Sequence, residues 1–281
     1  MTQQYSPQGF RMLPNGVKHL LIINILLYLA TIVINNQLHF DLNNYLALYF
    51  MGSDMFRPWQ YVTYMFMHGS LEHIFFNMFA LWMFGYILEN YWGTKRFLIF
   101  YFVCGIGAGL VHSLTIWLTS APILTAINDF ATSPSPDALI SLYNEHFDKV
   151  INPGWITEVS NNWRADLQNP DYGMYVTDKL MEVYNTRIIG IPTVGASGAI
   201  YGILLAFGMM FPNERIYLYF LVPIKAKWFV ILYAVIELVT GIAGTNDGVA
   251  HFAHLGGMIF GFLLILHWRH KANNSRWSNN I

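Results

Sequence analysis

Charged residues are scarce in this chain of 281 residues, since Asp, Glu, Lys and Arg together make up only 11% of it. Soluble globular domains usually carry about 25% charged residues, so this composition excludes an ordinary soluble domain. Hydrophobic residues account for 55% of the chain and aromatic residues for 17%. The sequence therefore predicts a protein that crosses a membrane several times.

An excess of positive charge is also absent, because the formal net charge is -1. Without a basic surface the chain has no electrostatic basis for binding nucleic acid, and we expect no such partner. The sequence contains one cysteine, Cys104, in an apolar run. No disulfide can form within the chain, so cysteine usage does not indicate a redox compartment.

Long apolar runs are what the sequence has instead. A helix needs about 20 apolar residues to cross a hydrocarbon core of ~30 Å. Segments that meet or approach this length lie at 17–36, 71–89, 96–118, 197–211, 227–244 and 249–268. The run from Ser197 to Phe211 would extend only about 22 Å. We predict an all-α membrane protein with a bundle of six transmembrane helices, in which Ser197 begins its helix inside the membrane.

The remaining segments divide the chain further. Residues 1–16 form a polar N-terminal segment, residues 17–118 hold spans one to three, residues 191–268 hold spans four to six, and residues 269–281 form a tail. Residues 119–190, with nine acidic and four basic residues, indicate a soluble insertion outside the cytoplasm. Apolar residues recur at helical spacing near 139–150 and 176–184, which favours two amphipathic helices there. A partly ordered loop remains the alternative for this segment.

Basic residues near span ends favour the cytoplasmic side of a membrane. Six spans would place ten of the fifteen Lys and Arg residues on one side, together with both termini. We therefore expect both termini to be cytoplasmic and Ser197 to face the outer side, with the bacterial plasma membrane as the expected location.

Six strongly polar side chains within the predicted spans are candidates for a site: His73, Asn77, His112, Glu237, His251 and His254. Such residues are costly in a membrane and usually mark a functional cavity. By the predicted topology, all except His112 and Glu237 lie near the level of Ser197. The sequence does not place those two.

His73 and Asn77 are four residues apart, so they share one helical face and can donate to one point. Two donors beside a helix N-terminus suit the stabilisation of an oxyanion. Hydrogen bonding between helices, with no chemical role, is the alternative for this pair.

His251 and His254 also share one face, and one of them could activate the Ser197 hydroxyl. Glycines spaced by four, Gly198 with Gly202 and Gly257 with Gly261, would allow the fourth and sixth spans to pack closely. Tyr201, one turn after Ser197, could stack on the imidazole. A zinc site on these histidines is the alternative. No aspartate is evident as a third member, which favours a Ser-His pair oriented by packing.

Three ordered motifs make the chain resemble the rhomboid family of intramembrane serine proteases. They are His68-Gly-Ser-Leu-Glu-His73-Ile-Phe-Phe-Asn77, Gly195-Ala-Ser197-Gly198 and Ala253-His254-Leu-Gly-Gly257. The resemblance implies that Ser197 is the nucleophile and His254 the general base. It implies an oxyanion hole made by His73, Asn77 and the Ser197 N–H, with Gly195, Gly198 and Tyr201 in support. By this resemblance we expect transmembrane protein substrates in a lipid bilayer, and neither a metal nor another cofactor.

Two other classes of function remain open at this stage. One is a rhomboid-like protein without catalytic activity that binds membrane clients. The other is a transporter of a solute or metal, which predicts broken helices in both halves of the chain, whereas one short span is visible. For the protease, we expect the 119–190 segment to control access or substrate choice.

Overall fold

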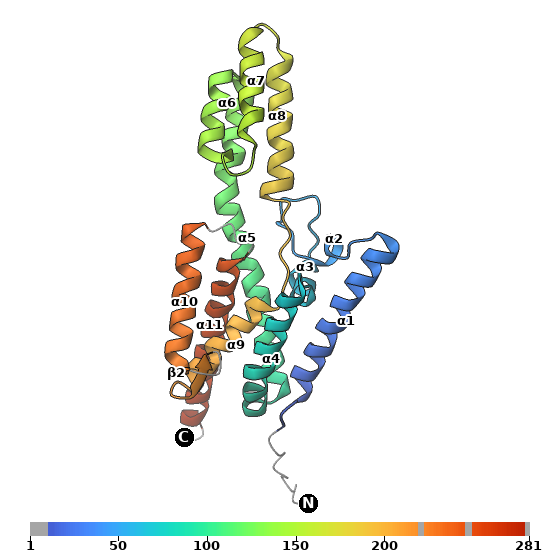
Figure 1. Ribbon diagram of the computed structural model, residues 1–281. Coiled ribbons are helices and arrows are strands. Elements are labelled where there is room, and N and C mark those ends of the chain that lie inside the picture. Colours follow the sequence, from blue (N-terminus) through green and yellow to red (C-terminus); the bar gives the residue numbers. More distant parts are fainter. Residues whose placement is uncertain (1–10, 219–221, 245–248, 279–281) are drawn as a thin grey trace, which may run out of the picture. The chain divides into compact units, whose positions relative to one another are not determined.

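The computed structural model describes residues 11–218, 222–244 and 249–278. The expected terminal segments 1–16 and 269–281 lie partly outside these ranges. The described elements are mostly helical (Figure 1). They divide into two compact units, one of residues 1–48, 58–112 and 193–281 and the other of residues 49–57 and 113–192.

The first unit contains most of the apolar helices. Among the described residues, five helices are long and apolar enough to cross a membrane: α1 (Asn15–Leu38), α4 (Leu71–Trp92), α5 (Thr94–Thr132), α10 (Ala226–Ala243) and α11 (His251–Ser278), the last over residues 251–271. The helix α9 (Ser197–Met210) is apolar but shorter. These six helices occupy the segments that the sequence analysis identified as spans.

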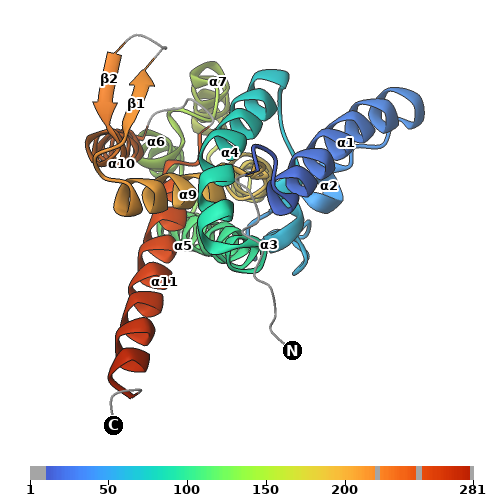
Figure 2. The ribbon, with the colours of Figure 1, turned by 90° about the horizontal axis from the view of Figure 1, so that it is seen from below.

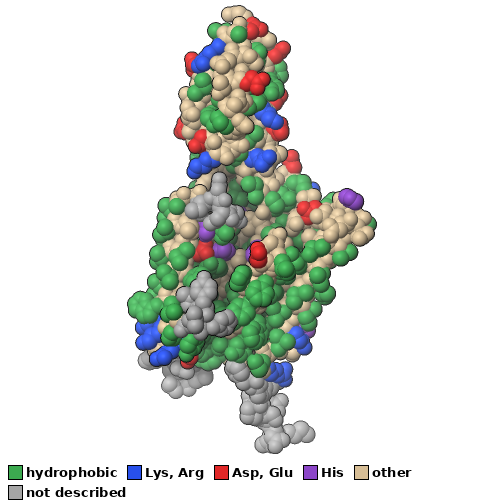
Figure 3. All heavy atoms as spheres, viewed as in Figure 1, with side chains coloured by type: hydrophobic (Ala, Val, Ile, Leu, Met, Phe, Trp, Pro, Cys, Tyr) green, Lys and Arg blue, Asp and Glu red, His purple; other side chains and the backbone are tan. Residues whose placement is uncertain are grey.

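Hydrophobic side chains cover the outside of this unit. Large apolar residues are exposed along α1 and α10, including Leu26, Val33, Val239 and Ile242. The visible face of these helices is largely hydrophobic, and Lys and Arg gather at the end of the bundle where β2 and the start of α10 lie (Figure 3). Continuous apolar surface of this kind is stable in lipid and not in water.

A buried carboxylate anchors α1. Glu89, in α4, accepts hydrogen bonds from the backbone N–H groups of Gly16 and Val17, each at 2.7 Å. The first N–H groups of a helix have no partner within it, and the N-terminus carries a partial positive charge, so a carboxylate stabilises this end. Thr94 also donates to Glu89, at 2.6 Å. A charged residue within a span here has a structural role.

Short elements connect the spans of the first unit. The helices α2 (Asn43–Leu46) and α3 (Gln60–Thr63) precede a 3-10 turn at Tyr64–Phe66. Between α9 and α10, β1 (Arg215–Leu218) pairs with β2 (Val222–Lys225) in antiparallel register, with Arg215 opposite Lys225. The sequence analysis predicted an all-α protein and missed this hairpin, whose strands are only four residues long. A strand of that length carries too little alternation to be recognised.

The helix that contains the third predicted span is longer than that span. The sequence analysis ended it at residue 118, whereas α5 continues to Thr132 with Pro122 inside the helix. Apolar residues after the proline retain helical spacing, and Ile127 and Phe130 are buried. Burial of this face compensates for the hydrogen bond that proline cannot make.

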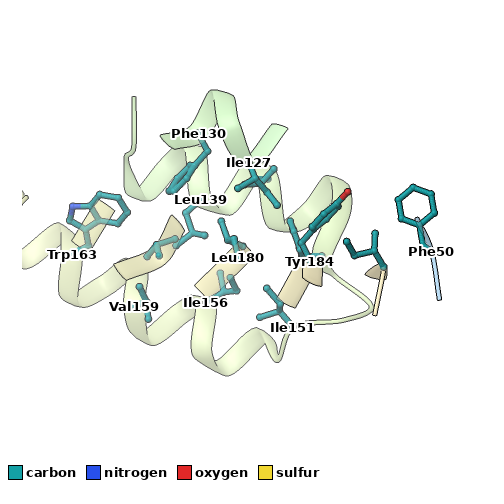
Figure 4. Packing of buried hydrophobic residues seen from close by; sticks show 14 residues of the cluster. Phe50, Ile127, Phe130, Leu139, Ile151, Ile156, Val159, Trp163, Leu180 and Tyr184 are labelled. Carbon is teal, nitrogen blue, oxygen red and sulfur yellow. The ribbon is translucent and has the colours of Figure 1, made fainter. Parts of the chain in front are cut away.

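The second unit is a small helical bundle. After α5 come α6 (Pro136–Leu142) with a π-helical turn at Tyr143–Phe147, α7 (Pro153–Ala165), and α8 (Asp171–Val183) with a second turn at Tyr184–Ile188. Their inner faces bury a hydrophobic core that includes Leu139, Phe147, Trp163 and Leu180 (Figure 4). The two helical patterns expected from the sequence correspond to α6 and α8. In the structure this segment forms α6, α7 and α8.

The helix α7 was not expected. Its start is marked by Asn152, whose side chain accepts from the Gly154 N–H at 2.7 Å, and by Pro153 in the first turn. Its buried residues Ile156, Val159 and Trp163 follow helical spacing. The polar residues between them, including Asn161 and Asn162, concealed this pattern.

Candidate active site

The backbone before Ser197 is fixed by its neighbours. Leu48 and Thr193 exchange two backbone hydrogen bonds of 2.9 and 2.8 Å. Gly195 donates its N–H to the Tyr64 carbonyl at 2.9 Å, and its φ is 126°, a value that favours glycine. The helix α9 then starts at Ser197. The Gly-Ala-Ser turn therefore places the hydroxyl at a helix N-terminus, where backbone N–H groups lack partners within the helix.

The backbones of α9 and α11 pack directly against each other. A Cβ added to Gly257 would lie 1.8 Å from the Gly198 carbonyl oxygen, and one added to Gly202 would lie 3.0 Å from the Gly257 oxygen. Only glycine permits this approach, as the spacing of the glycines predicted. Figure 2 shows α9 among α4, α10 and α11, and α9 packs against all three.

Ser197 and His254 meet across this contact. The Nε2 atom of His254 lies 2.8 Å from the Ser197 Oγ, at hydrogen-bond distance. His254 is 8% exposed. The ring of Tyr201 stacks on the His254 imidazole, with centroids 4.2 Å apart and planes inclined by 7°. The arrangement is that of a hydroxyl held against a base, and the stacking expected from the sequence is present.

A carboxylate occupies the other side of His254. The Oε2 atom of Glu237, in α10, lies 3.0 Å from the His254 Nδ1. The same oxygen lies 2.7 Å from the His251 Nδ1, and Tyr201 donates its hydroxyl to Oε1. The sequence analysis expected an imidazole oriented by packing and did not place Glu237; in the structure the ring is stacked on Tyr201, and this carboxylate also lies against its Nδ1.

Helix geometry contained the missing signal. Glu237 lies six residues before the end of α10 at Ala243, and His254 lies three residues after the start of α11. At ~1.5 Å per residue these positions differ in depth by only about 5 Å if the helices run antiparallel. Consecutive spans must be antiparallel, so the sequence was sufficient to bring Glu237 to the level of the histidines.

His73 borders the turn that carries Ser197. Ser70 caps α4 by accepting from the His73 N–H at 3.1 Å, which fixes His73 in the first turn. A Cβ added to Gly195 would lie 2.8 Å from the His73 Nε2 and 3.6 Å from the Ser197 Oγ. His73 and Ser197 therefore flank the same glycine, and a side chain at position 195 would collide with the imidazole.

Asn77 has a different environment from the one expected. Its side chain is buried, with 6% exposure, and its Nδ2 donates to the His73 carbonyl of the same helix at 2.8 Å. The amide nitrogen carries a second N–H, which can serve another acceptor. His73 and Asn77 share one face of α4, and His73 lies beside Gly195 of the serine turn.

The last polar residue in the spans, His112, lies on α5. Its Nε2 is 2.6 Å from the Thr193 Oγ1, in the strand-like segment that precedes the serine turn. This contact further fixes the backbone segment that precedes Ser197. Within residues 11–218, 222–244 and 249–278, no group of three or more His, Cys, Asp or Glu side chains is arranged to hold a metal ion.

His68, which precedes α4, makes the stability of the fold sensitive to acid. It is 3% exposed. Burial, reinforced by the charge of nearby His73, lowers the pKa of His68 from 6.5 to about 4. Between these two pKa values the unfolded chain binds a proton on His68 and the folded protein does not. The contribution of His68 to the free energy of unfolding is therefore complete above pH 6.5 and decreases as the pH falls toward 4.

We expect the free energy of unfolding to fall by about 2 kcal/mol from this residue between pH 7 and pH 5, at ~1.4 kcal/mol per pH unit below the ordinary pKa of histidine. Chemical unfolding in detergent measures the change in unfolding free energy between pH 7 and pH 5 for wild type and for His68→Gln. The difference between the two changes is the contribution of His68. Equal pH dependence in the two proteins would contradict it.

Comparison with known proteins agrees with this geometry. The Rhomboid domain family model matches residues 55–124 and 171–270. The chain is 28% identical to the rhomboid protease AarA of Providencia stuartii, over 87% of this chain and 69% of that protein. It is 27% identical to an uncharacterized mitochondrial rhomboid protein of Schizosaccharomyces pombe, over 77% of this chain and 53% of that protein.

A chloroplastic rhomboid-like protein of Arabidopsis thaliana is 26% identical, over 67% of this chain and 56% of that protein. The chain thus spans about half the length of these mitochondrial and chloroplastic relatives. The matched family segments contain His73, Ser197, Glu237 and His254 and the helices that carry them. This chain is an integral multi-pass membrane protein and belongs to the rhomboid family.

Proposed function

We propose that this protein is an intramembrane serine endopeptidase that cleaves membrane-anchored proteins at or near the outer face of the bilayer. The observation that carries the proposal is the 2.8 Å contact between the Ser197 hydroxyl and the His254 Nε2. A serine hydroxyl is a weak nucleophile until a base removes its proton. The similar protein AarA is named a rhomboid protease, which supports the same activity.

The reaction follows from the two side chains. His254 takes the Ser197 proton on Nε2 while Oγ attacks the carbonyl carbon of the scissile bond. His254 then gives that proton to the leaving amine, the C–N bond breaks, and the acyl group remains on Ser197. Water attacks the ester with His254 again as base, which releases the carboxylic acid and restores the serine.

The tetrahedral intermediates carry a negative oxygen that needs donors. We assign this role to the Ser197 backbone N–H at the start of α9, the His73 imidazole and the Asn77 amide. The position of His73 beside Gly195 supports its assignment. For Asn77 the available donor is the N–H that the His73 carbonyl does not use. Preorganised donors of this kind stabilise developing charge most strongly where water is scarce.

The depth of Ser197 determines how a substrate must bind. Because α9 has 14 residues, it extends about 21 Å, less than the hydrocarbon core. A substrate helix keeps its carbonyls in hydrogen bonds, so it must unwind locally before Ser197 can attack. Gly or Pro near the cleavage site would lower the cost of unwinding.

The orientation is part of the same proposal. A six-span topology with both termini cytoplasmic places the basic residues of the β1–β2 hairpin, the start of α10 and the end of α11 on one side. The gathering of Lys and Arg at the β2 end of the bundle supports this arrangement (Figure 3). Ser197 then faces the outer side of a bacterial plasma membrane, with residues 119–190 as an extracytoplasmic insertion that controls access or substrate choice.

A fluorophosphonate probe tests the proposal, because it reacts covalently with an activated serine. Purified wild-type protein in detergent is expected to be labelled, and peptide mass spectrometry should place the adduct on Ser197. Ser197→Ala should not be labelled, and His254→Ala should react at least ~10²-fold more slowly. Equal labelling of the three proteins, or an adduct elsewhere in wild type, would remove the protease assignment.

A further inference from the structure

We propose that Glu237 is a positioning residue for the base, so that the site works as a Ser197–His254–Glu237 triad and not as a two-residue pair. The inference rests on the proposed function, because it concerns the residue that holds His254. Glu237 does not contact the Ser197 side of the ring. Its effect on the reaction passes through His254.

The two nitrogens of His254 have complementary partners. Nε2 lies 2.8 Å from the Ser197 Oγ in a hydrogen bond, and Nδ1 lies 3.0 Å from the Glu237 Oε2 in a close charge contact without hydrogen-bond geometry. A neutral imidazole carries one ring proton, and its other nitrogen is an acceptor. An ionised carboxylate can only accept, so Glu237 favours the tautomer with the proton on Nδ1. That tautomer leaves the Nε2 lone pair for the serine proton.

The carboxylate itself is held from two other sides. Tyr201, on α9, donates its hydroxyl to Oε1, and the His251 Nδ1 on α11 lies 2.7 Å from Oε2. Glu237 is 5% exposed. Tyr201 also stacks on His254, so one tyrosine fixes both the carboxylate and the imidazole that it contacts. This packing removes the rotational freedom that would otherwise weaken the contact with Nδ1.

Charge gives Glu237 a second effect. When His254 accepts the serine proton, an imidazolium forms among apolar helices. A carboxylate 3.0 Å from Nδ1 compensates that charge at the moment it appears. An acidic residue within a span is costly, and such residues usually face a bundle interior or cavity and serve a function.

A purely structural role is the competing explanation, since Glu237 also contacts His251. The chain contains a matched control for it. Glu89, on α4, is likewise a buried carboxylate among the spans, but its partners are the N–H groups of Gly16 and Val17 and the Thr94 hydroxyl. Replacing Glu89 with glutamine should lower stability and leave the chemistry of Ser197 unchanged.

The experiment compares wild type, Glu237→Gln, Glu237→Asp and Glu89→Gln as full-length proteins. A single-span membrane protein that wild type cleaves serves as substrate in liposomes, with kcat and KM measured separately. Fluorophosphonate labelling rates and melting temperatures are measured on the same samples. Glutamine keeps the shape of the side chain but not its charge, whereas aspartate keeps the charge on a side chain shorter by one methylene.

Glu237→Gln is expected to lower kcat by ~10²- to 10⁴-fold with KM within about twofold, because substrate binding does not involve the carboxylate. Glu237→Asp should recover part of the loss, and labelling rates should follow the same order. If Glu237→Gln does not fold, Glu237→Asp takes its place as the test, and a loss in kcat at unchanged KM for this variant supports the proposal.

Two results would overturn the inference. One is a kcat for Glu237→Gln within about threefold of wild type while wild type is active and labelled, which refutes the positioning role alone. The other is a loss that Glu89→Gln reproduces at an equal fall in melting temperature. A wild-type protein that neither cleaves nor reacts refutes the proposed function, and this inference with it.

Discussion

Ser197→Ala is expected to lower the turnover of a membrane-anchored substrate by roughly 10⁴-fold or more, down to background. The reason is chemical: without Oγ no acyl-enzyme forms, and the His254 Nε2 loses the atom from which it takes a proton. The remaining donors around His73 can still polarise a carbonyl, but nothing attacks it. Cleavage of a reconstituted single-span substrate, followed by gel electrophoresis over hours, measures the residual rate.

The same substitution should leave the fold intact. The Ser197 hydroxyl contributes one side-chain hydrogen bond in the structure, to His254, and such a bond has a net value of about 1 kcal/mol. Ser160→Ala is a suitable control, because the Ser160 hydroxyl is buried without a hydrogen-bond partner in the second unit. It should retain full turnover. Residual cleavage by Ser197→Ala above a few per cent of wild type would contradict the assignment of the nucleophile.

The sequence predicted the central part of the candidate site because local rules determine it. The glycine before Ser197, the four-residue spacing of His73 and Asn77 and the glycine pairs on two spans each require only helix periodicity and steric reasoning. The structure shows those glycines in contact and places Ser197 against His254.

Glu237 shows where the sequence reasoning stopped. The residue was recognised as costly within a span, but its partners lie on two other helices, Tyr201 on α9 and two histidines on α11. Contacts between helices depend on rotation about each axis as well as depth. Periodicity along one helix does not specify how that helix is rotated against its neighbours, so the contacts of Glu237 could not be predicted from it.

The limits in the second unit have another origin. Membrane spans show as uniform apolar runs, whereas α7 buries only a few residues and has polar residues on its other face. The continuation of α5 beyond residue 118 depends on Ile127 and Phe130 finding partners in that bundle. Burial in that bundle therefore decides both the presence of α7 and the length of α5, and hydropathy along the sequence does not reveal it.

Gly257→Ala is expected to have the largest effect on stability. The added Cβ would lie 1.8 Å from the Gly198 carbonyl oxygen, which is backbone and cannot rotate away. The helices α9 and α11 must separate by more than 1 Å to relieve this overlap. We expect a loss of ~3 kcal/mol in the free energy of unfolding, at the upper end of the range for overpacking.

The same separation should impair the chemistry, because Ser197 lies on α9 and His254 on α11. A displacement of about 1 Å between reacting groups can lower a rate by ~10²-fold, so the fluorophosphonate labelling rate should fall by about that factor in the folded fraction.

Gly202→Ala should have a smaller effect on stability, because its Cβ would meet the Cys104 side chain at 2.5 Å and the Gly257 oxygen at 3.0 Å. Gly69→Ala is the control for stability, since its nearest atom would be 3.9 Å away. Unfolding midpoints in detergent should therefore follow the order Gly69→Ala, Gly202→Ala, Gly257→Ala from highest to lowest, and a Gly257→Ala midpoint equal to that of Gly69→Ala would refute the proposed importance of this helix contact.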